Sequence, residues 1–360
     1  MNSWISSYGS KWASSSYSLY GVPNEEPYSH LDLTKDESFF GDCCIYGDRL
    51  YIRTGGYDEE GILTCYDLKN NRIDWRGKYY FGHTSSMVIE NDRLAIGYLV
   101  IDTSKGEVLF DVRDKFQSFE DDMYGMTYLV DNILYKTIDF YDLSSGYIRY
   151  DIEKDVISEI SICDSSIKFI KGKILICTKQ NKLYAYDLNI GSILWELLLE
   201  INEPIIHLDN DKVVVLGTHI LCEVDFFSGE ILHRSNLIDS MTGFLDCVPA
   251  NLNNYSSCIN NDFLVIYSSL GVGAWIMVID RDCYEILYIK KDKDIGAVSI
   301  CGDLIFYCNG KNKLQALTKN SDKVIWTSSE NITARSIVSS NSYMVVGAIH
   351  GGFTIFKADT

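Results

Sequence analysis

Residues 182–196 read Lys-Leu-Tyr-Ala-Tyr-Asp-Leu-Asn-Ile-Gly-Ser-Ile-Leu-Trp-Glu, and this stretch predicts a β-hairpin. A first strand of alternating residues runs to Asp187, and a second strand returns through Trp195. Between them lie an asparagine and a glycine, residues that tight turns between antiparallel strands favour. The rest of the chain repeats this unit, so the repeat decides the predicted fold.

Copies of Asp187 recur along the chain and mark the start of each turn. The equivalent residues are Asp67, Asp102, Asp142, Asp225, Asp280, Thr318 and, at the end, Lys357. Six positions after each of these anchors, with Asp187 included and Lys357 left out, comes a β-branched residue: Ile73, Val108, Ile148, Ile193, Ile231, Ile286 and Val324. Eight positions after them comes an aromatic residue or histidine: Trp75, Phe110, Tyr150, Trp195, His233, Tyr288 and Trp326. Glycine fills the fourth position in four copies: Gly106, Gly146, Gly191 and Gly229. Positions two apart share one face of a strand, so each copy predicts the same returning strand.

A second anchor lies upstream in each unit, where a turn residue precedes an apolar strand. It falls at Leu50, Leu94, Leu134, Ile174, Val213, Leu264, Leu304 and Tyr343. The copies are spaced by about 40 residues, a period typical of β-propellers with four strands in each repeat. We therefore predict an all-β, eight-bladed propeller of four-stranded antiparallel blades. The interval from Val213 to Leu264 is longer, and seven blades is the alternative.

The residue pattern of 182–196 resembles the PQQ-like repeat of quinoprotein dehydrogenases and outer-membrane assembly factors, and the resemblance extends from Phe39 onward. It implies the propeller fold and, for the aromatic column at Trp75 and its equivalents, a structural role between neighbouring blades. It implies little about activity, because one fold hosts many unrelated functions.

The ends of the chain are predicted to complete the ring. Residues 36–360 form one propeller domain, and residues 1–35 carry no repeat. The last unit supplies strands near 337–339, 343–348 and 353–356 but lacks an outer strand. Because an open strand edge invites aggregation, we expect a segment within residues 3–20 to supply that strand and close the ring.

Composition excludes several classes of function. The N-terminal residues resemble no signal peptide, and no apolar run approaches the roughly 18 residues of a membrane span. Eleven cysteines without a Cys-x-x-Cys pair are expected to be buried thiols in a reducing cytoplasm. A net charge of −18 argues against binding to nucleic acid or anionic membranes. The same charge favours a basic protein partner, and we expect a monomer when that partner is absent.

Four long loops are predicted on one face, because the loops joining blades and those between second and third strands lie on the same side. They are residues 57–60, 78–83, 116–124 and 241–255. Long, aromatic and acidic loops on a rigid scaffold favour recognition of a basic partner. The predicted partner-binding residues are Tyr57, Asp58, Glu59, Glu60, Tyr80, Phe81, His83, Phe116, Phe119, Glu120, Asp121, Asp122, Tyr124, Phe244 and Asp246.

No constellation of residues predicts catalysis, a metal or a cofactor. Adjacent cysteines lie against the cofactor in quinoprotein alcohol dehydrogenases, but Cys43 and Cys44 are predicted to point to opposite faces of a strand. The acidic run from Glu120 to Asp122 lacks the spaced oxygens of a calcium loop. The anchoring aspartates recur around the ring and converge on no pocket.

The sequence therefore predicts a cytoplasmic, non-enzymatic protein-binding propeller. One concrete version is an immunity-type inhibitor that covers the active cleft of a toxin. Two alternatives stay open: an enzyme with its site in the central channel, as in PQQ-dependent proteins, and a scaffold subunit of a stable complex.

Overall fold

The computed structural model describes residues 4–7, 22–33, 43–55, 60–81, 86–115, 127–139, 145–162, 166–199, 204–217, 220–240, 256–268, 274–340, 342–348 and 352–358. The chain divides into two compact units. The first comprises Met1–Ser7, Phe40–Val213 and Val224–Leu232, and the second comprises Tyr8–Phe39, Val214–Glu223 and His233–Thr360. Among the described residues no helix is long and apolar enough to span a membrane.

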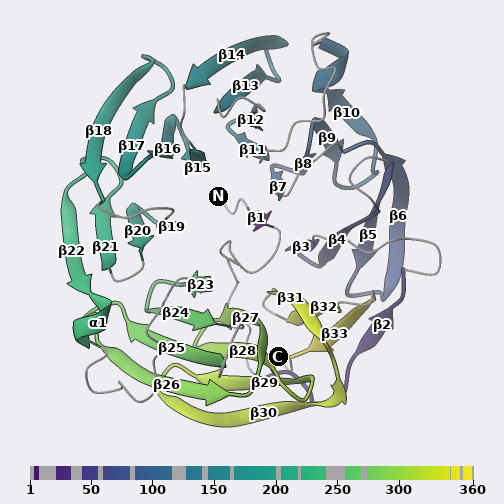
Figure 1. The fold of residues 1–360 in the computed structure, drawn as a ribbon. Helices are drawn as coiled ribbons and strands as arrows, with labels where there is room; N and C mark the ends of the chain where they lie inside the picture. Colours follow the sequence, from purple (N-terminus) through teal and green to yellow (C-terminus); the bar gives the residue numbers. More distant parts are fainter. Residues whose placement is uncertain are drawn as a thin grey trace. The chain divides into compact units, whose positions relative to one another are not determined.

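The first four blades are antiparallel sheets in chain order (Figure 1). Blade one consists of β3 (Cys43–Tyr46), β4 (Arg49–Thr54), β5 (Gly61–Asp67) and β6 (Arg72–Tyr79). Blade two consists of β7 (Ser86–Glu90), β8 (Arg93–Ile96), β9 (Leu99–Asp102) and β10 (Val108–Asp111), followed by the 3-10 helix η1 (Val112–Lys115). Blade three consists of β11 (Thr127–Val130), β12 (Ile133–Asp139), β13 (Ser145–Asp151) and β14 (Val156–Ile162). Blade four consists of β15 (Ser166–Lys171), β16 (Ile174–Lys179), β17 (Lys182–Asp187) and β18 (Ser192–Leu198).

The last four blades follow the same plan. Blade five consists of β19 (Ile205–Asp209), β20 (Lys212–Leu216), β21 (Ile220–Asp225) and β22 (Ile231–Asn236), followed by α1 (Leu237–Ser240). Blade six consists of β23 (Ser256–Ile259), β24 (Phe263–Ser268), β25 (Ala274–Asp280) and β26 (Ile286–Asp292). Blade seven consists of β27 (Ile295–Cys301), β28 (Leu304–Asn309), β29 (Lys313–Thr318) and β30 (Ser321–Asn331). Blade eight consists of β31 (Ala334–Ser339), β32 (Tyr343–Ala348), β33 (Phe353–Lys357) and β2 (Ser29–Leu31). The eight-bladed β-propeller is confirmed, and the seven-bladed alternative is excluded.

The core lies between the sheets, where apolar side chains of neighbouring blades meet. In the first unit Val88 and Val100 of blade two pack in one cluster with Leu129 and Leu134 of blade three. In the second unit comparable clusters join blade six to blade seven and blade seven to blade eight. Burial of apolar surface is the main favourable term in folding, so contacts between blades stabilise the fold as well as those within blades.

An N-terminal strand completes blade eight, but the predicted segment was wrong. The strand is β2, where Ser29 pairs with Ile355 and Leu31 with Phe353 of β33. It does not lie within residues 3–20. Those residues instead contain β1 (Trp4–Ser7), which adds a fifth strand to blade two beside β7. The physical reason is connection length: β2 lies nearer in sequence to Cys43, where blade one starts, and short connections are the rule in compact folds.

The repeat was misplaced in blade three. The predicted anchor Asp142 lies outside the described residues, and the turn between β13 and β14 begins at Asp151. The N–H of Ile152 donates to the carbonyl of Asn132, as the N–H of Leu68 does to the carbonyl of Asp48 in blade one. Tyr150 is therefore a residue of the third strand and not of the aromatic column. Gly146 and Ile148 lie in that third strand too.

Candidate functional site

The predicted loop surface lies mostly outside the described residues. Those outside are Tyr57, Asp58, Glu59, His83, Phe116, Phe119, Glu120, Asp121, Asp122, Tyr124, Phe244 and Asp246. Their role in partner binding stays a prediction. Of the described three, Glu60 is exposed and Tyr80 is half-buried. The Arg113 guanidinium carbon lies 4.8 Å from the centre of the Tyr80 ring, a cation–π contact.

Phe81 is a core residue rather than a surface contact. It is 1% exposed, and its ring lies 5.8 Å from that of Tyr79, centroid to centroid. The guanidinium carbon of Arg53 lies 5.4 Å from the same ring. The prediction that Phe81 touches a partner does not fit this structure, because the ring is buried against residues of blade one.

The anchoring aspartates are structural, as the sequence predicts. The Oδ1 of Asp225 accepts hydrogen bonds from the N–H groups of Phe227 at 3.1 Å and Ser228 at 2.8 Å. Equivalent bonds form at Asp67, Asp102, Asp151, Asp187 and Asp280. The backbone N–H of Ser228 and its hydroxyl lower the pKa of Asp225, because they stabilise the carboxylate form.

Several residues of the aromatic column donate a side-chain hydrogen bond to a backbone carbonyl in the turn at the anchor residue of the next blade, and so link the two blades. Trp75 Nε1 donates to the carbonyl of Thr103 at 2.9 Å, and Trp195 Nε1 donates to that of Phe226 at 3.0 Å. The rings also cover the glycine of the next turn. A Cβ on Gly229 would lie 2.6 Å from Trp195 Cγ, and one on Gly106 would lie 2.7 Å from Trp75 Cε3.

The junction between blades five and six, within the second unit, breaks this pattern. His233 takes the tryptophan position, and Tyr284 takes the glycine position with a φ of 60°. The two rings stack with centroids 3.4 Å apart and an interplanar angle of 2°. Burial lowers the pKa of His233. A bulky residue in the left-handed region is strained, so the stacking offsets a backbone cost.

A buried ion pair lies beside these rings. Arg281 Nη2 and Nε donate to Oε1 of Glu223 at 2.7 and 3.0 Å, and the two side chains are 5% and 1% exposed. Arg281 Nη1 also donates to the carbonyl of Asn260. Burial and the Glu223 carboxylate raise the pKa of Tyr284. We call Glu223, His233, Arg281 and Tyr284 the Glu223 cluster. The repeat pattern did not predict this cluster, although Tyr284 in a glycine position was a signal.

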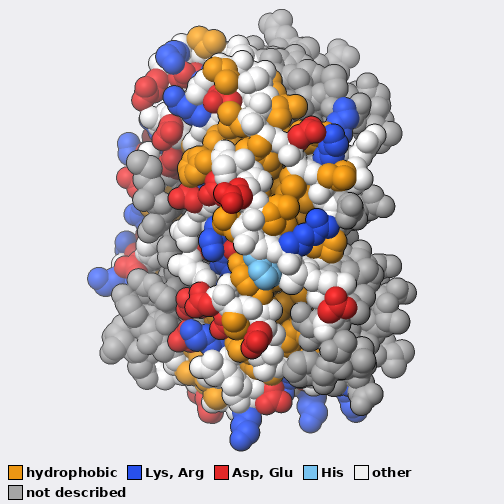
Figure 2. All heavy atoms as spheres, turned by 90° about the vertical axis from the view of Figure 1, so that its left-hand side faces the viewer, with side chains coloured by type: hydrophobic (Ala, Val, Ile, Leu, Met, Phe, Trp, Pro, Cys, Tyr) orange, Lys and Arg blue, Asp and Glu red, His pale blue; other side chains and the backbone are white. Residues whose placement is uncertain are grey.

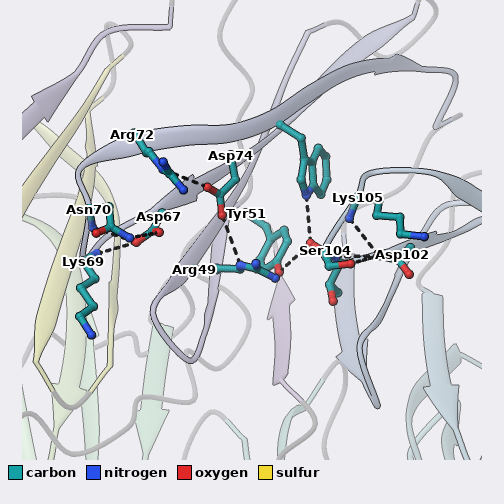
Figure 3. A network of polar contacts seen from close by, with 12 residues as sticks. Arg49, Tyr51, Asp67, Lys69, Asn70, Arg72, Asp74, Asp102, Ser104 and Lys105 are labelled. Atoms are coloured by element: carbon teal, nitrogen blue, oxygen red, sulfur yellow. Dashed lines mark hydrogen bonds and ion pairs between the residues drawn. The ribbon is translucent and has the colours of Figure 1, made fainter.

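A polar hollow of about 250 Å³ lies at the turns of blades one and two, within the first unit. Figure 3 shows the polar contacts of Arg49 and Asp67, which are among its lining residues. Asp74 accepts ion pairs from Arg49 at 3.5 Å and Arg72 at 3.4 Å. Asp67 is already bound by the side chain and N–H of Asn70. Of the lining residues, Arg49 and Asp67 are engaged in these contacts, and the hollow indicates no particular ligand.

A band of exposed apolar side chains follows the outer strands of blades four and five and the turns that precede those strands (Figure 2). We call it the rim surface. Its members are between 39% and 69% exposed: Ile190, Ile193, Leu194, Leu198, Phe227, Ile231 and Leu232. All belong to the first unit. Contiguous exposed apolar area usually marks an interaction site, so this is the strongest candidate surface among the described residues.

The described residues contain no cluster of side chains suited to a metal ion. Cys43 and Cys44 are both buried free thiols in β3. Of the described cysteines only Cys283 is exposed, and all are free. Nothing in this arrangement places a reactive pair of sulfur atoms at a surface.

No known protein family matches the sequence, and no curated protein matches it either. Solved structures are similar in fold. BamB from Moraxella catarrhalis has a TM-score of 0.62 at 10% identity, over 94% of this chain and 98% of that one. Saccharomyces cerevisiae Sqt1 has a TM-score of 0.62 at 12% identity, over 94% and 100%. The quinohemoprotein alcohol dehydrogenase ADHIIG of Pseudomonas putida has a TM-score of 0.64 at 10% identity, over 95% and 76%. At such identities the likeness concerns the PQQ-like propeller fold alone.

Proposed function

We propose that this chain is a non-enzymatic propeller that binds another protein, and that it acts in the cytoplasm. The observation that carries the proposal is the rim surface. Seven large apolar side chains are exposed there: five lie on the outer strands β18 and β22, and two lie in the turns that precede those strands. Keeping them in water is unfavourable, and a protein partner would bury them.

The partner we propose is basic. The chain carries a net charge of −18, which attracts a positively charged surface over long range and speeds its association. The acidic loops at 57–60 and 116–124 would add to this field. An immunity-type inhibitor of a toxin is one protein of this kind, with the loop face covering the toxin's cleft.

The free thiols support the proposed compartment. All described cysteines are unbridged, and most are buried as small apolar side chains. Disulfides are rare where the thiol pool is reduced, so this pattern suits a cytoplasmic protein.

The test is photo-crosslinking in the cells from which the protein comes. A crosslinking amino acid replaces Leu194 on the rim surface in one strain and Ile73 on blade one in another. We expect one basic protein to crosslink at position 194, in smaller amount at high ionic strength, and not at position 73. Failure to crosslink any protein at position 194 would overturn the proposal. A purified protein that carries a chromophore or metal would instead support the enzyme alternative.

A further inference from the structure

We propose that β18 is an acceptor edge to which an extended, basic segment of the partner adds as a fifth strand of blade four. This rests on the proposed function, because it specifies how the rim surface is used. The added strand would lie antiparallel or parallel beside Ser192–Leu198 and hydrogen-bond to its backbone.

The first observation is the open edge. In blade four the strand order is β15-β16-β17-β18, and among the described residues β17 is the only strand paired with β18. Alternate N–H and C=O groups of a terminal strand point away from its neighbour. Such a row is a template for another strand, and an extended peptide that adds to it gains its affinity from main-chain hydrogen bonds.

The second observation is that this edge lacks protection. Proteins commonly shield edge strands with charged side chains, above all lysine. The outer strand β6 of blade one has this protection, with Arg72, Asp74, Arg76 and Lys78 among its residues. Glu196 is the single charged residue of β18. Exposed apolar residues six and seven positions after the anchor recur in other blades, so among the described residues it is the added Leu198 that distinguishes β18.

The third observation is charge, and it specifies the occupant. The register of β18 against β17 shifts between Ile193 and Trp195. Beyond this bulge Glu196 and Leu198 share one face, so a strand beside them would match with a basic and an apolar residue. Glu196 is 54% exposed and bound by Lys182 at 3.1 Å, a pairing that a partner lysine or arginine would replace or share. The net charge of −18 favours the same sign of partner.

A second copy of this chain fits the edge less well. A second β18 strand would offer Glu196 and no basic residue, and both copies would carry the same large negative charge. We therefore commit to a partner segment that is basic and apolar in alternation.

The experiment uses a phage-displayed library of random seven-residue peptides, selected on the full-length protein and counter-selected on Ile193→Lys. The matched control is Ile73→Lys, which occupies the same repeat position on β6. Ile193 and Ile73 are 53% and 43% exposed, so both variants should fold. We expect selected peptides that alternate apolar residues with lysine or arginine. Ile193→Lys should weaken their binding about tenfold or more, because lysine is the residue that natural edges use against pairing.

Three further measurements decide between the outcomes. A selected peptide remade with N-methyl groups on alternate backbone nitrogens should lose binding, since it keeps its side chains but loses the backbone N–H groups that would donate to β18. Glu196→Lys should weaken the binding of basic peptides by about fivefold, as expected for one lost ion pair. Binding that survives N-methylation, selected peptides that are acidic, or equal losses in Ile193→Lys and Ile73→Lys would each overturn the proposal. So would a wild-type dimer that Ile193→Lys dissociates in analytical ultracentrifugation.

The two proposals fail in distinguishable ways. If a native protein crosslinks at position 194 but no peptide binds the edge, strand addition is wrong and the proposed function stands. If peptides bind the edge but no native protein crosslinks there, β18 is an acceptor edge and the proposed function is wrong.

Discussion

Two junctions between blades use the same repeat positions in different ways. Where blade four meets blade five, Trp195 covers Gly229 and donates one hydrogen bond to the carbonyl of Phe226. Where blade five meets blade six, His233 stacks on Tyr284, and the buried pair of Glu223 and Arg281 lies beside them. His233 Nε2 has no hydrogen-bond partner among the described residues. The first junction is apolar with a single side-chain hydrogen bond, and the second is a polar network.

The comparison teaches that two repeat positions are coupled across a blade boundary. The side chain eight positions after one anchor fills the space next to the residue four positions after the next anchor, so the two side chains compete for the same volume. A tryptophan in the first position goes with glycine in the second, as at Trp75 with Gly106 and Trp195 with Gly229. The smaller imidazole of His233 leaves room that the Tyr284 ring fills. Close packing in protein interiors makes such compensation necessary.

The largest effect is expected from Glu223→Ala at the polar junction. It leaves the Arg281 guanidinium buried without its carboxylate, which typically costs about 3–5 kcal/mol. Denaturant unfolding monitored by tryptophan fluorescence measures the loss. The double variant Glu223→Leu with Arg281→Met should cost less than the single change, because it leaves no buried charge. A double variant at least as unstable as the single one would show that the ion pair itself stabilises this junction.

The next effect is expected from Trp195→Ala at the apolar junction. The side chain is 8% exposed, and truncating it removes its packing and its hydrogen bond, at a cost of about 3 kcal/mol. His233→Ala should cost less, since the ring is smaller and its Nε2 makes no hydrogen bond to a described residue. Thermal unfolding of the two variants compares the junctions directly. Equal losses would contradict the distinction drawn between them.

A smaller effect is expected from Gly229→Ala. Both Gly229 and Gly191 have a positive φ, 73° and 68°, so alanine at either position strains the backbone. Only at Gly229 would the new Cβ also overlap a ring, because at Gly191 its nearest neighbour is the Tyr186 hydroxyl at 3.5 Å. We expect Gly229→Ala to cost about 1–3 kcal/mol more than Gly191→Ala, a typical cost of overpacking. Similar costs at the two positions would refute the coupling of ring and glycine.

The smallest effect is the loss of stability at low pH, and it should be the same for the anchoring aspartates at both junctions. Backbone N–H groups hold the pKa of Asp225 and of Asp280 below the ordinary value of about 4. A carboxyl whose folded pKa is lowered contributes stability above its unfolded pKa and loses that contribution as pH falls through the folded pKa. The stability difference between wild type and Asp225→Ala should therefore shrink from pH 4 toward pH 2. Urea unfolding at several pH values tests this, and a difference that stays constant would contradict it.

Local patterns in the sequence account for most of the fold. The aspartate turns depend on residues two or three apart, and the alternation of apolar residues marks each strand, so both are visible in one stretch of sequence. The aromatic column at Trp75, Trp195 and Tyr288 was predicted correctly for the same reason. Tyr288 donates its hydroxyl proton to the carbonyl of Thr318 at 2.7 Å.

The prediction of the turn in blade three was wrong because more than one position in that stretch matched the repeat pattern equally well. Residues 142–150 contain an aspartate, a glycine and aromatic residues at the repeat spacing, yet the turn begins at Asp151. The register of a strand is set by its partners and not by its own sequence. The same holds for the rim surface and the loop residues. The sequence shows the type of each side chain, but its exposure depends on which elements of the fold cover it.

The sequence by itself determined the number of repeats, the strands and turns within each, and the acidic charge of the chain, because these depend on local periodicity and composition. Only the tertiary structure decided that residues 29–31 complete blade eight, that Arg281 reaches Glu223, and that no second described strand pairs with β18. These depend on segments distant in sequence meeting in space. Such meetings are governed by packing and connection length, which a single stretch of sequence does not contain.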